Sequence, residues 1–134
     1  MKNKAFTLIE LLVVFSLIGI IISVSLVAYS STRKSARDGK RKADLEQIRS
    51  ALEMYRADVG SYPTTLNFGG SLTFGSDVYM AAIPNDPLAP TYQYLYSQTG
   101  QNSYKLCAFL EMGSGDPGCG SCGSANCNYK VTNP

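Results

Sequence analysis

The sequence predicts an α+β fold in which one long N-terminal helix packs against a small antiparallel β-sheet of three or four strands. Three observations support this prediction. An apolar run fills residues 11–28 without a charged side chain, and apolar residues then recur at helical spacing over residues 45–59. Short aromatic segments between Gly and Pro turns fill the remainder. We therefore expect a membrane-spanning half and an amphipathic half of the same helix, the second half covered by a small head.

The apolar run has the length of a membrane helix. Residues 11–28 lie at the lower limit for a span, and adding residues 6–9 extends the run beyond it. A secretory signal is the simpler alternative, because Lys2 and Lys4 precede the run. The run is too long for the apolar region of such a signal, and Glu10 lies inside it. A plain anchor explains the length but not Glu10, since a charge in the middle of a membrane helix costs roughly 2.5–3.5 kcal/mol.

Residues 4–10, KAFTLIE, resemble the cleavage motif of bacterial type IV prepilins and type II secretion pseudopilins. The resemblance implies that prepilin peptidase removes a cytoplasmic leader of residues 1–5 between Ala5 and Phe6, and that Phe6 becomes an N-methylated terminus. Residues 6–30 would then be retained as a transmembrane helix and later as filament core, with residues 31–134 forming an extracytoplasmic head. The family usually has Gly at the position of Ala5, and we expect this difference to slow cleavage by the peptidase.

Glu10 matches the glutamate that the family has as the fifth residue after the cut. Cleavage creates an α-ammonium group on Phe6, and Glu10 can supply its anion within the chain or to a neighbouring copy. A buried ion pair barely repays its desolvation, but removing one partner costs roughly 3–5 kcal/mol. We therefore predict that Glu10 and Phe6 form the charge pair that sets the register of assembly between subunits.

The charges of the chain are unevenly distributed. Residues 33–56 hold eight basic and four acidic side chains, whereas residues 57–134 hold two basic and five acidic ones. This pattern favours contacts between the head of one copy and the basic helix of another, or between the helix and anionic lipid. The basic residues that follow the apolar run would place the head in the cytoplasm by the positive-inside rule. The cleavage motif and the cysteines favour the opposite: a single pass through the bacterial inner membrane with the N-terminus in the cytoplasm.

The basic run over residues 33–42 has two interpretations. A solvent-exposed helix face or a subunit contact is favoured, because Asp38 interrupts the run and no aromatic residues interleave to stack on bases. DNA is the alternative partner, since DNA uptake by pili is known in the family.

The head begins within the helix. Gly60 is predicted to end the helix, and residues 61–77 read as a loop on its flank. Three prolines exclude a regular ladder before Tyr92. The predicted helix stripe consists of Leu45, Ile48, Leu52, Tyr55 and Val59, and the predicted strands are residues 92–96, 104–110 and 129–132.

Four cysteines, Cys107, Cys119, Cys122 and Cys127, lie near the C-terminus and predict two disulfides. Zinc and free thiols are the alternatives, but no histidine is present and a head outside the cytoplasm favours oxidation. Three pairings are open, of which we favour 107–127 with 119–122. The acidic calcium loop common in major pseudopilins is replaced here by residues 112–128, where Asp116 is the one carboxylate. We therefore expect no metal and no cofactor.

The order of the motifs at residues 62–64, 83–87 and 92–94 resembles the major pseudopilin and its pilin relatives. No catalytic residues and no enzyme activity are expected. The missing calcium loop favours a structural subunit of a type IV pilus, serving adhesion, twitching motility or DNA uptake. The alternative is the major pseudopilin of a type II secretion system, and the second alternative is a membrane-tethered or secreted binding module.

The resemblance also implies a set of partners and a location. The expected partners are other copies in a helical polymer, minor pilins, prepilin peptidase, an inner-membrane assembly platform, and lipid before assembly. The expected location is the inner membrane, followed by an extracellular pilus or a periplasmic pseudopilus.

Overall fold

The computed structural model describes residues 6–115 and 117–133, with residues 24–28 described by their helical backbone alone. The predicted leader, residues 1–5, lies outside the described residues. The chain separates into two compact units, Met1–Lys34 and Ser35–Pro134, and each is considered by itself. The α+β prediction is confirmed, because a long helix and small antiparallel sheets make up the described chain.

The helix, α1, comprises Leu8–Val59. It ends where the sequence predicted, at Gly60, which has a positive φ of 86° and donates its amide hydrogen to the Arg56 carbonyl at 2.8 Å. Glycine adopts this left-handed conformation without the steric cost that a Cβ atom brings, and it is the residue that most often follows a helix end.

Over the described residues, no helix combines the length and the apolar character that a membrane crossing requires. The predicted span includes residues 24–28, whose side chains are not described. The transmembrane segment over residues 6–30 therefore stays a prediction.

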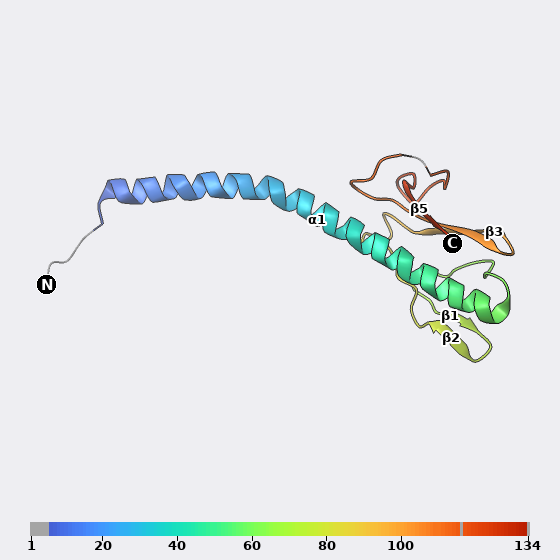
Figure 1. Ribbon diagram of the computed structural model, residues 1–134. Coiled ribbons are helices and arrows are strands. Elements are labelled where there is room, and N and C mark those ends of the chain that lie inside the picture. The colour runs from blue at the N-terminus through green and yellow to red at the C-terminus, as the bar shows by residue number, and fades with distance from the viewer. Residues whose placement is uncertain (1–5, 116, 134) are drawn as a thin grey trace. The chain divides into compact units, whose positions relative to one another are not determined.

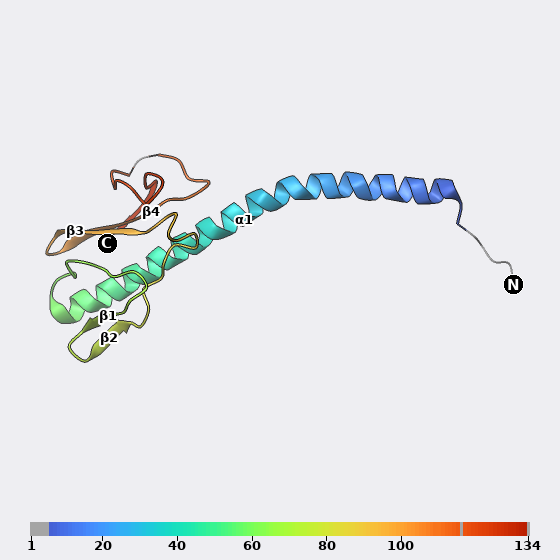
Figure 2. The same ribbon diagram turned by 180° about the vertical axis from the view of Figure 1, so that it is seen from behind.

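The head contains two antiparallel sheets. A hairpin pairs β1, Leu72–Phe74, with β2, Asp77–Met80. The second sheet has the order β3-β4-β5, formed by Leu95–Gly100, Ser103–Ala108 and Tyr129–Thr132. Figures 1 and 2 both show this sheet on one side of the C-terminal half of α1 and the β1–β2 hairpin on another.

Three segments differ from the strand predictions. The strand predicted at residues 104–110 is β4, which begins at Ser103 and ends at Ala108. The predicted strand at residues 92–96 begins instead at Leu95, because Tyr92 forms an isolated bridge with Gly123 and Gln93 donates its amide to the Cys122 carbonyl at 2.9 Å. The segment read as a loop contains β1 and part of β2, which turn at Gly75 with a φ of 60°. The last predicted strand, residues 129–132, is confirmed as β5.

The core lies between α1 and the sheets. The predicted helix stripe is confirmed in its centre, because Leu45, Ile48 and Leu52 are at most 1% exposed. Side chains from the loops and strands complete this core: Tyr62, Leu72, Ile83, Tyr94, Tyr104, Leu106, Ala108 and Val131. Burial of these apolar groups is the main favourable contribution to folding of the head.

Candidate functional site

The N-terminal end of α1 is a capping box. Thr7 directly precedes the helix, and its backbone amide and hydroxyl donate hydrogen bonds to Glu10 Oε2 at 2.9 and 2.8 Å. The Glu10 amide donates in return to Thr7 Oγ1 at 3.3 Å. A Thr followed three residues later by Glu is the sequence signature of this arrangement, and it satisfies backbone donors that a helix start otherwise leaves free. This capping role of Glu10 was not predicted from the sequence, although the spacing of Thr7 and Glu10 indicates it.

Beyond the cap, the first turns of α1 present large apolar side chains that the rest of the described chain does not cover. Phe6 is 88% exposed, Leu8 82% and Ile9 70%. The same holds, to a smaller degree, for Leu11, Leu12, Val13, Val14, Phe15, Leu17, Ile18, Ile20, Ile21 and Ile22. An uncovered apolar surface of this extent is typical of a membrane or protein interaction site.

The predicted processing site is only partly within the described chain. Ala5 lies outside the described residues, and Phe6 precedes the helix. Cleavage after Ala5 and methylation of Phe6 therefore stay predictions. The same holds for the charge pair of Glu10 with the Phe6 amine, but the capping box places the Glu10 carboxylate against the amide of the residue after Phe6.

Arg41, on the part of α1 that belongs to the head, is a buried arginine. The Arg41 side chain is fully buried and makes a two-bond contact with Asp86, from Nε to Oδ2 at 2.7 Å and from Nη2 to Oδ1 at 3.1 Å. Its Nη1 donates to Asp38 at 2.8 Å and to Glu111 at 3.0 Å. The guanidinium also lies 5.7 Å from the centroid of the Tyr92 ring. Arg41 thus joins α1 to two loops that are remote in sequence.

Arg37 strengthens the same network. Its Nε and Nη2 donate to the two carboxylate oxygens of Glu111, each at 2.6 Å. The hydrogen bonds from Arg37, and secondarily those from Arg41, lower the pKa of Glu111 to about 2. Asp38 accepts the backbone amides of Glu111 and Met112 at 2.9 and 2.8 Å. The turn after β4 is therefore attached to α1 by charge-assisted hydrogen bonds, which are the stronger kind.

This network corrects the interpretation of the basic run. Arg41 is buried and Arg37 is half-buried, and both bind carboxylates of the head, whereas Arg33, Lys34 and Lys40 are exposed. The carboxylates that receive the two arginines come from residues 86 and 111, which local helix periodicity cannot connect to the run. DNA as a partner of the remaining cations stays an untested alternative.

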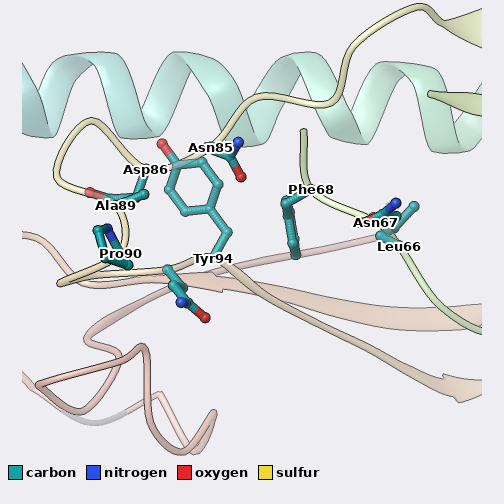
Figure 3. Close-up of a pocket in the computed structure, with 9 residues that line it drawn as sticks. Leu66, Asn67, Phe68, Asn85, Asp86, Ala89, Pro90 and Tyr94 are labelled. Carbon is teal, nitrogen blue, oxygen red and sulfur yellow. The ribbon is translucent and has the colours of Figure 1, made fainter. Parts of the chain in front are cut away.

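A second polar contact lies beside the network. Tyr94 donates its hydroxyl to Asp44 at 2.9 Å, and burial together with this carboxylate raises the pKa of the phenol. The Tyr94 ring borders a pocket of about 370 Å³ (Figure 3), where Phe68 approaches it edge-on at 5.9 Å between ring centroids. Side-chain amides of Asn67, Asn85 and Gln93 also line the pocket, but nothing in it identifies a ligand.

The cysteines form two disulfides, as predicted, but the favoured pairing was wrong. Cys107 pairs with Cys119 and Cys122 with Cys127. The reason is the backbone path: Cys127 pairs its amide with the Gly120 carbonyl at 2.9 Å, which closes residues 120–127 into a small loop of its own. All four cysteines are buried and form a second apolar cluster with Leu95 and Phe109 packed against it.

The small disulfide loop packs closely on the segment before β3. The Ser124 amide donates to the Thr91 carbonyl at 3.0 Å. Gly123 has a φ of 94°, and a Cβ atom at this position would lie 2.5 Å from that carbonyl oxygen. The glycine is therefore required by close backbone approach, and the loop holds the same segment whose Asp86 binds Arg41.

Within residues 6–115 and 117–133, no group of three or more His, Cys, Asp or Glu side chains is arranged to hold a metal ion. The acidic residues of the Arg41 network are paired with the two arginines.

Two family profiles match this chain, one at its N-terminus and one over most of the remaining residues. Residues 1–26 match the profile described as the prokaryotic N-terminal methylation motif. Residues 28–121 match the profile described as type II secretion system (T2SS), protein G. Because this match covers more than half of the chain, the chain belongs to the type II secretion system protein G family. No solved structure shows a significant match.

Curated relatives agree with the family. The chain is 28% identical over 103 residues to the type II secretion system core protein G of Dickeya chrysanthemi, covering 69% of this chain and 67% of the relative. It is 29% identical over 128 residues to that of Pectobacterium carotovorum subsp. carotovorum, covering 87% and 80%. It is 30% identical over 105 residues to that of Pseudomonas aeruginosa, covering 70% and 74%.

The family corrects the favoured functional prediction. The absence of the acidic calcium loop predicts a type IV pilus subunit, and this prediction is wrong, because the comparisons support the alternative, a type II secretion pseudopilin. The composition of one C-terminal loop did not identify the family, because the match covers the helix from residue 28 onward and most of the head.

Proposed function

We propose that this protein is the major pseudopilin of a type II secretion system, a structural subunit that polymerises into a periplasmic filament and has no enzyme activity. One observation carries the proposal: the N-terminal methylation motif over residues 1–26 is followed directly by the protein G match from residue 28. A processing motif on an apolar helix that leads into a pseudopilin head is what such a subunit requires.

The exposed apolar side chains of α1 support a change of environment during the life of the subunit. Before assembly, lipid of the inner membrane covers residues such as Phe6, Leu8 and Ile9, which are 70–88% exposed in the single chain. After assembly, the apolar parts of α1 from neighbouring copies cover these side chains instead. Because apolar burial is favourable in proportion to area, both environments stabilise the segment, whereas water does not.

Cleavage of the leader gives the apolar helix its new N-terminus at Phe6. In this proposal prepilin peptidase cuts between Ala5 and Phe6 on the cytoplasmic side, and an inner-membrane assembly platform then extracts the subunit into the filament. Glu10 pairs with the new α-ammonium group of a neighbouring copy, since a carboxylate left without a cation in an apolar bundle is strongly unfavourable.

Mass spectrometry of the mature protein tests the processing step. We expect the chain to begin at a methylated Phe6 when the gene is expressed beside a prepilin peptidase. A mature protein that still begins at Met1, or that begins near Ser31 after signal-peptide cleavage, would contradict the proposal.

Deletion of the gene tests the secretion role. We expect loss of the exported enzymes from the culture medium and their accumulation in the periplasm, with normal surface pili and twitching. Restoration by the plasmid-borne gene is the control. Loss of surface pili with normal secretion would identify a pilus subunit, and a head that stays soluble outside sheared fibres would identify a binding module.

A further inference from the structure

One face of α1 in the head unit is left exposed by the residues that the structure describes. Its residues follow one another at intervals of three or four, the spacing that places side chains on the same side of a helix. This face is distinct from the buried stripe of Leu45, Ile48 and Leu52. We call it the outer face, and it consists of Ala36, Lys40, Ala43, Gln47, Ser50, Met54 and Asp58, all of them exposed.

A groove of about 400 Å³ runs between the outer face and the chain at and after β2. Small side chains line it on both sides, with Ser50 and Ala51 from α1 and Ala81 and Ala82 from the β2 side. Met54 is 50% exposed at its border. Small residues at a helix surface permit a second helix to approach at the short end of the usual 8–10 Å range between axes.

The two ends of the outer face carry opposite charge. Lys40 is 60% exposed near the start, whereas Asp58 and Asp77 are exposed at the other end of the helix segment and on β2. Tyr79 lines the groove, and burial together with the negative charges of Asp58 and Asp77 raises the pKa of its phenol.

The exposed apolar residues are found at the acidic end. Phe74 is 52% exposed and Val78 61%, and the Phe74 ring lies 6.0 Å from that of Tyr55 on α1. The basic end has small neighbours instead, Ala36 and Ala43 on either side of Lys40. The two ends are thus complementary in charge. The exposed Lys40 ammonium, which lies 3.8 Å from Asp44 Oδ1 within its own helix, is at one end, and two exposed carboxylates are at the other.

We infer that the groove and acidic end of one copy bind the outer face around Lys40 of a second copy. This inference rests on the proposed function, because a filament of subunits that are all anchored by the same end has parallel helices. Parallel copies without an axial offset would place Lys40 beside Lys40 and Asp58 beside Asp58, which is unfavourable. An offset that places residue 40 of one copy beside residue 58 of the next corresponds to about 27 Å at 1.5 Å per residue.

A charge exchange in the full-length chain tests the contact. The variants are Lys40→Glu, Asp58→Lys and the double variant, expressed in the native host and measured as the amount of pseudopilin in the sheared filament fraction. Each single variant is expected to reduce filament yield about tenfold by placing like charges together, and the double variant is expected to return to within about twofold of wild type. Lys42→Glu is the matched control, because Lys42 is exposed but lies on the opposite side of the helix, and it should assemble normally. Its ammonium lies 5.6 Å from the centroid of the Tyr129 ring, so urea unfolding is measured for all the variants to show that the heads stay folded.

The outcomes separate this contact from the proposed function. Wild-type filaments together with normal filaments from both single variants would overturn the contact and leave the proposed function standing. Defective single variants that the double variant fails to restore would also overturn it, as would an equal loss in Lys42→Glu. No filament from the wild-type chain would overturn both.

Discussion

The two units of this chain differ in how far they bury their apolar side chains within the chain itself. In the N-terminal unit a capping box precedes the apolar part of α1, and the large apolar side chains described over residues 6–22 are exposed. The first backbone amides of the helix thus have hydrogen-bond partners, whereas these side chains have no cover. The head covers its own apolar stripe, pairs its buried charges within the chain and closes its C-terminal region with two disulfides. The head therefore buries its own apolar groups, whereas the exposed apolar side chains of the N-terminal unit can be buried only by contacts outside the single chain.

Glu10→Gln is the variant with the largest expected effect, a loss of filaments of at least about tenfold with normal folding of the head. The substitution leaves the α-ammonium group of Phe6 without its anion in an apolar bundle, which is strongly unfavourable. Gln can still complete a capping box with Thr7, so the helix start is retained. Sheared filament yield measures the effect. Thr7→Val is the converse control, since it breaks the cap and keeps the charge, and we expect it to assemble better than Glu10→Gln. Normal filaments from Glu10→Gln would show that Glu10 acts through the cap alone.

Arg41→Ala is expected to have the largest effect on the head. It leaves Asp86 and Asp38, 5% and 6% exposed, without their buried cation. Removing one partner of a buried ion pair costs about 3–5 kcal/mol, a large part of the stability of a small domain. Urea unfolding of the full chain in detergent measures the free energy of unfolding. Arg49→Ala is the control, because its pair with Glu46 is about half exposed and should contribute less than about 1 kcal/mol.

Gly123→Ala is expected to cost about 1–3 kcal/mol through backbone strain, with an added contact penalty against the Thr91 carbonyl. Gly120→Ala is the matched control, because Gly120 has a φ of 92° but nothing within 4 Å of its Cβ position. Thermal unfolding should rank Gly123→Ala as clearly the less stable. Equal melting temperatures would show that the disulfide loop does not need its close contact with the segment before β3.

Acid should weaken the head through Glu111. Its pKa is lowered from 4.5 to about 2 by the hydrogen bonds from Arg37 and Arg41, so the folded state holds the ionised form more strongly than the unfolded state does. The stabilisation is present above pH 4.5 and is lost as the pH falls from there towards 2. Unfolding free energies measured at pH 6, 4 and 3 check this. Glu111→Gln should flatten this part of the profile, and an unchanged slope in that variant would contradict the assignment.

Tyr104→Phe is expected to have the smallest effect and to be neutral or slightly stabilising. Tyr104 is 1% exposed, and its hydroxyl has no hydrogen-bond partner among the described residues. Tyr62→Phe is the matched control, because the Tyr62 hydroxyl donates to Glu53 at 2.7 Å and its loss should cost about 1 kcal/mol. Equal losses in the free energy of unfolding of the two variants, measured in urea, would show that the hydrogen bond of the Tyr62 hydroxyl contributes no more than the unpaired Tyr104 hydroxyl does.

Local patterns in the sequence were enough to predict the long helix, its buried stripe and its end. The helix stripe at Leu45, Ile48 and Leu52 and the stop at Gly60 follow from side-chain periodicity and from the conformational freedom of glycine, which act over one or two helical turns. The processing motif is likewise local, since residues 4–10 carry it. The capping box of Thr7 and Glu10 was also readable from its spacing and was missed.

Only the tertiary structure decided the partners of Arg37 and Arg41, the pairing of the cysteines and the outer face of α1. Asp86 and Glu111 lie 45 and 70 residues from Arg41, and no periodic pattern connects positions so far apart. Four cysteines allow three pairings of equal chemistry, and the backbone path selects among them. These contacts depend on how loops return to the helix, so they are properties of the folded chain and not of any short stretch within it.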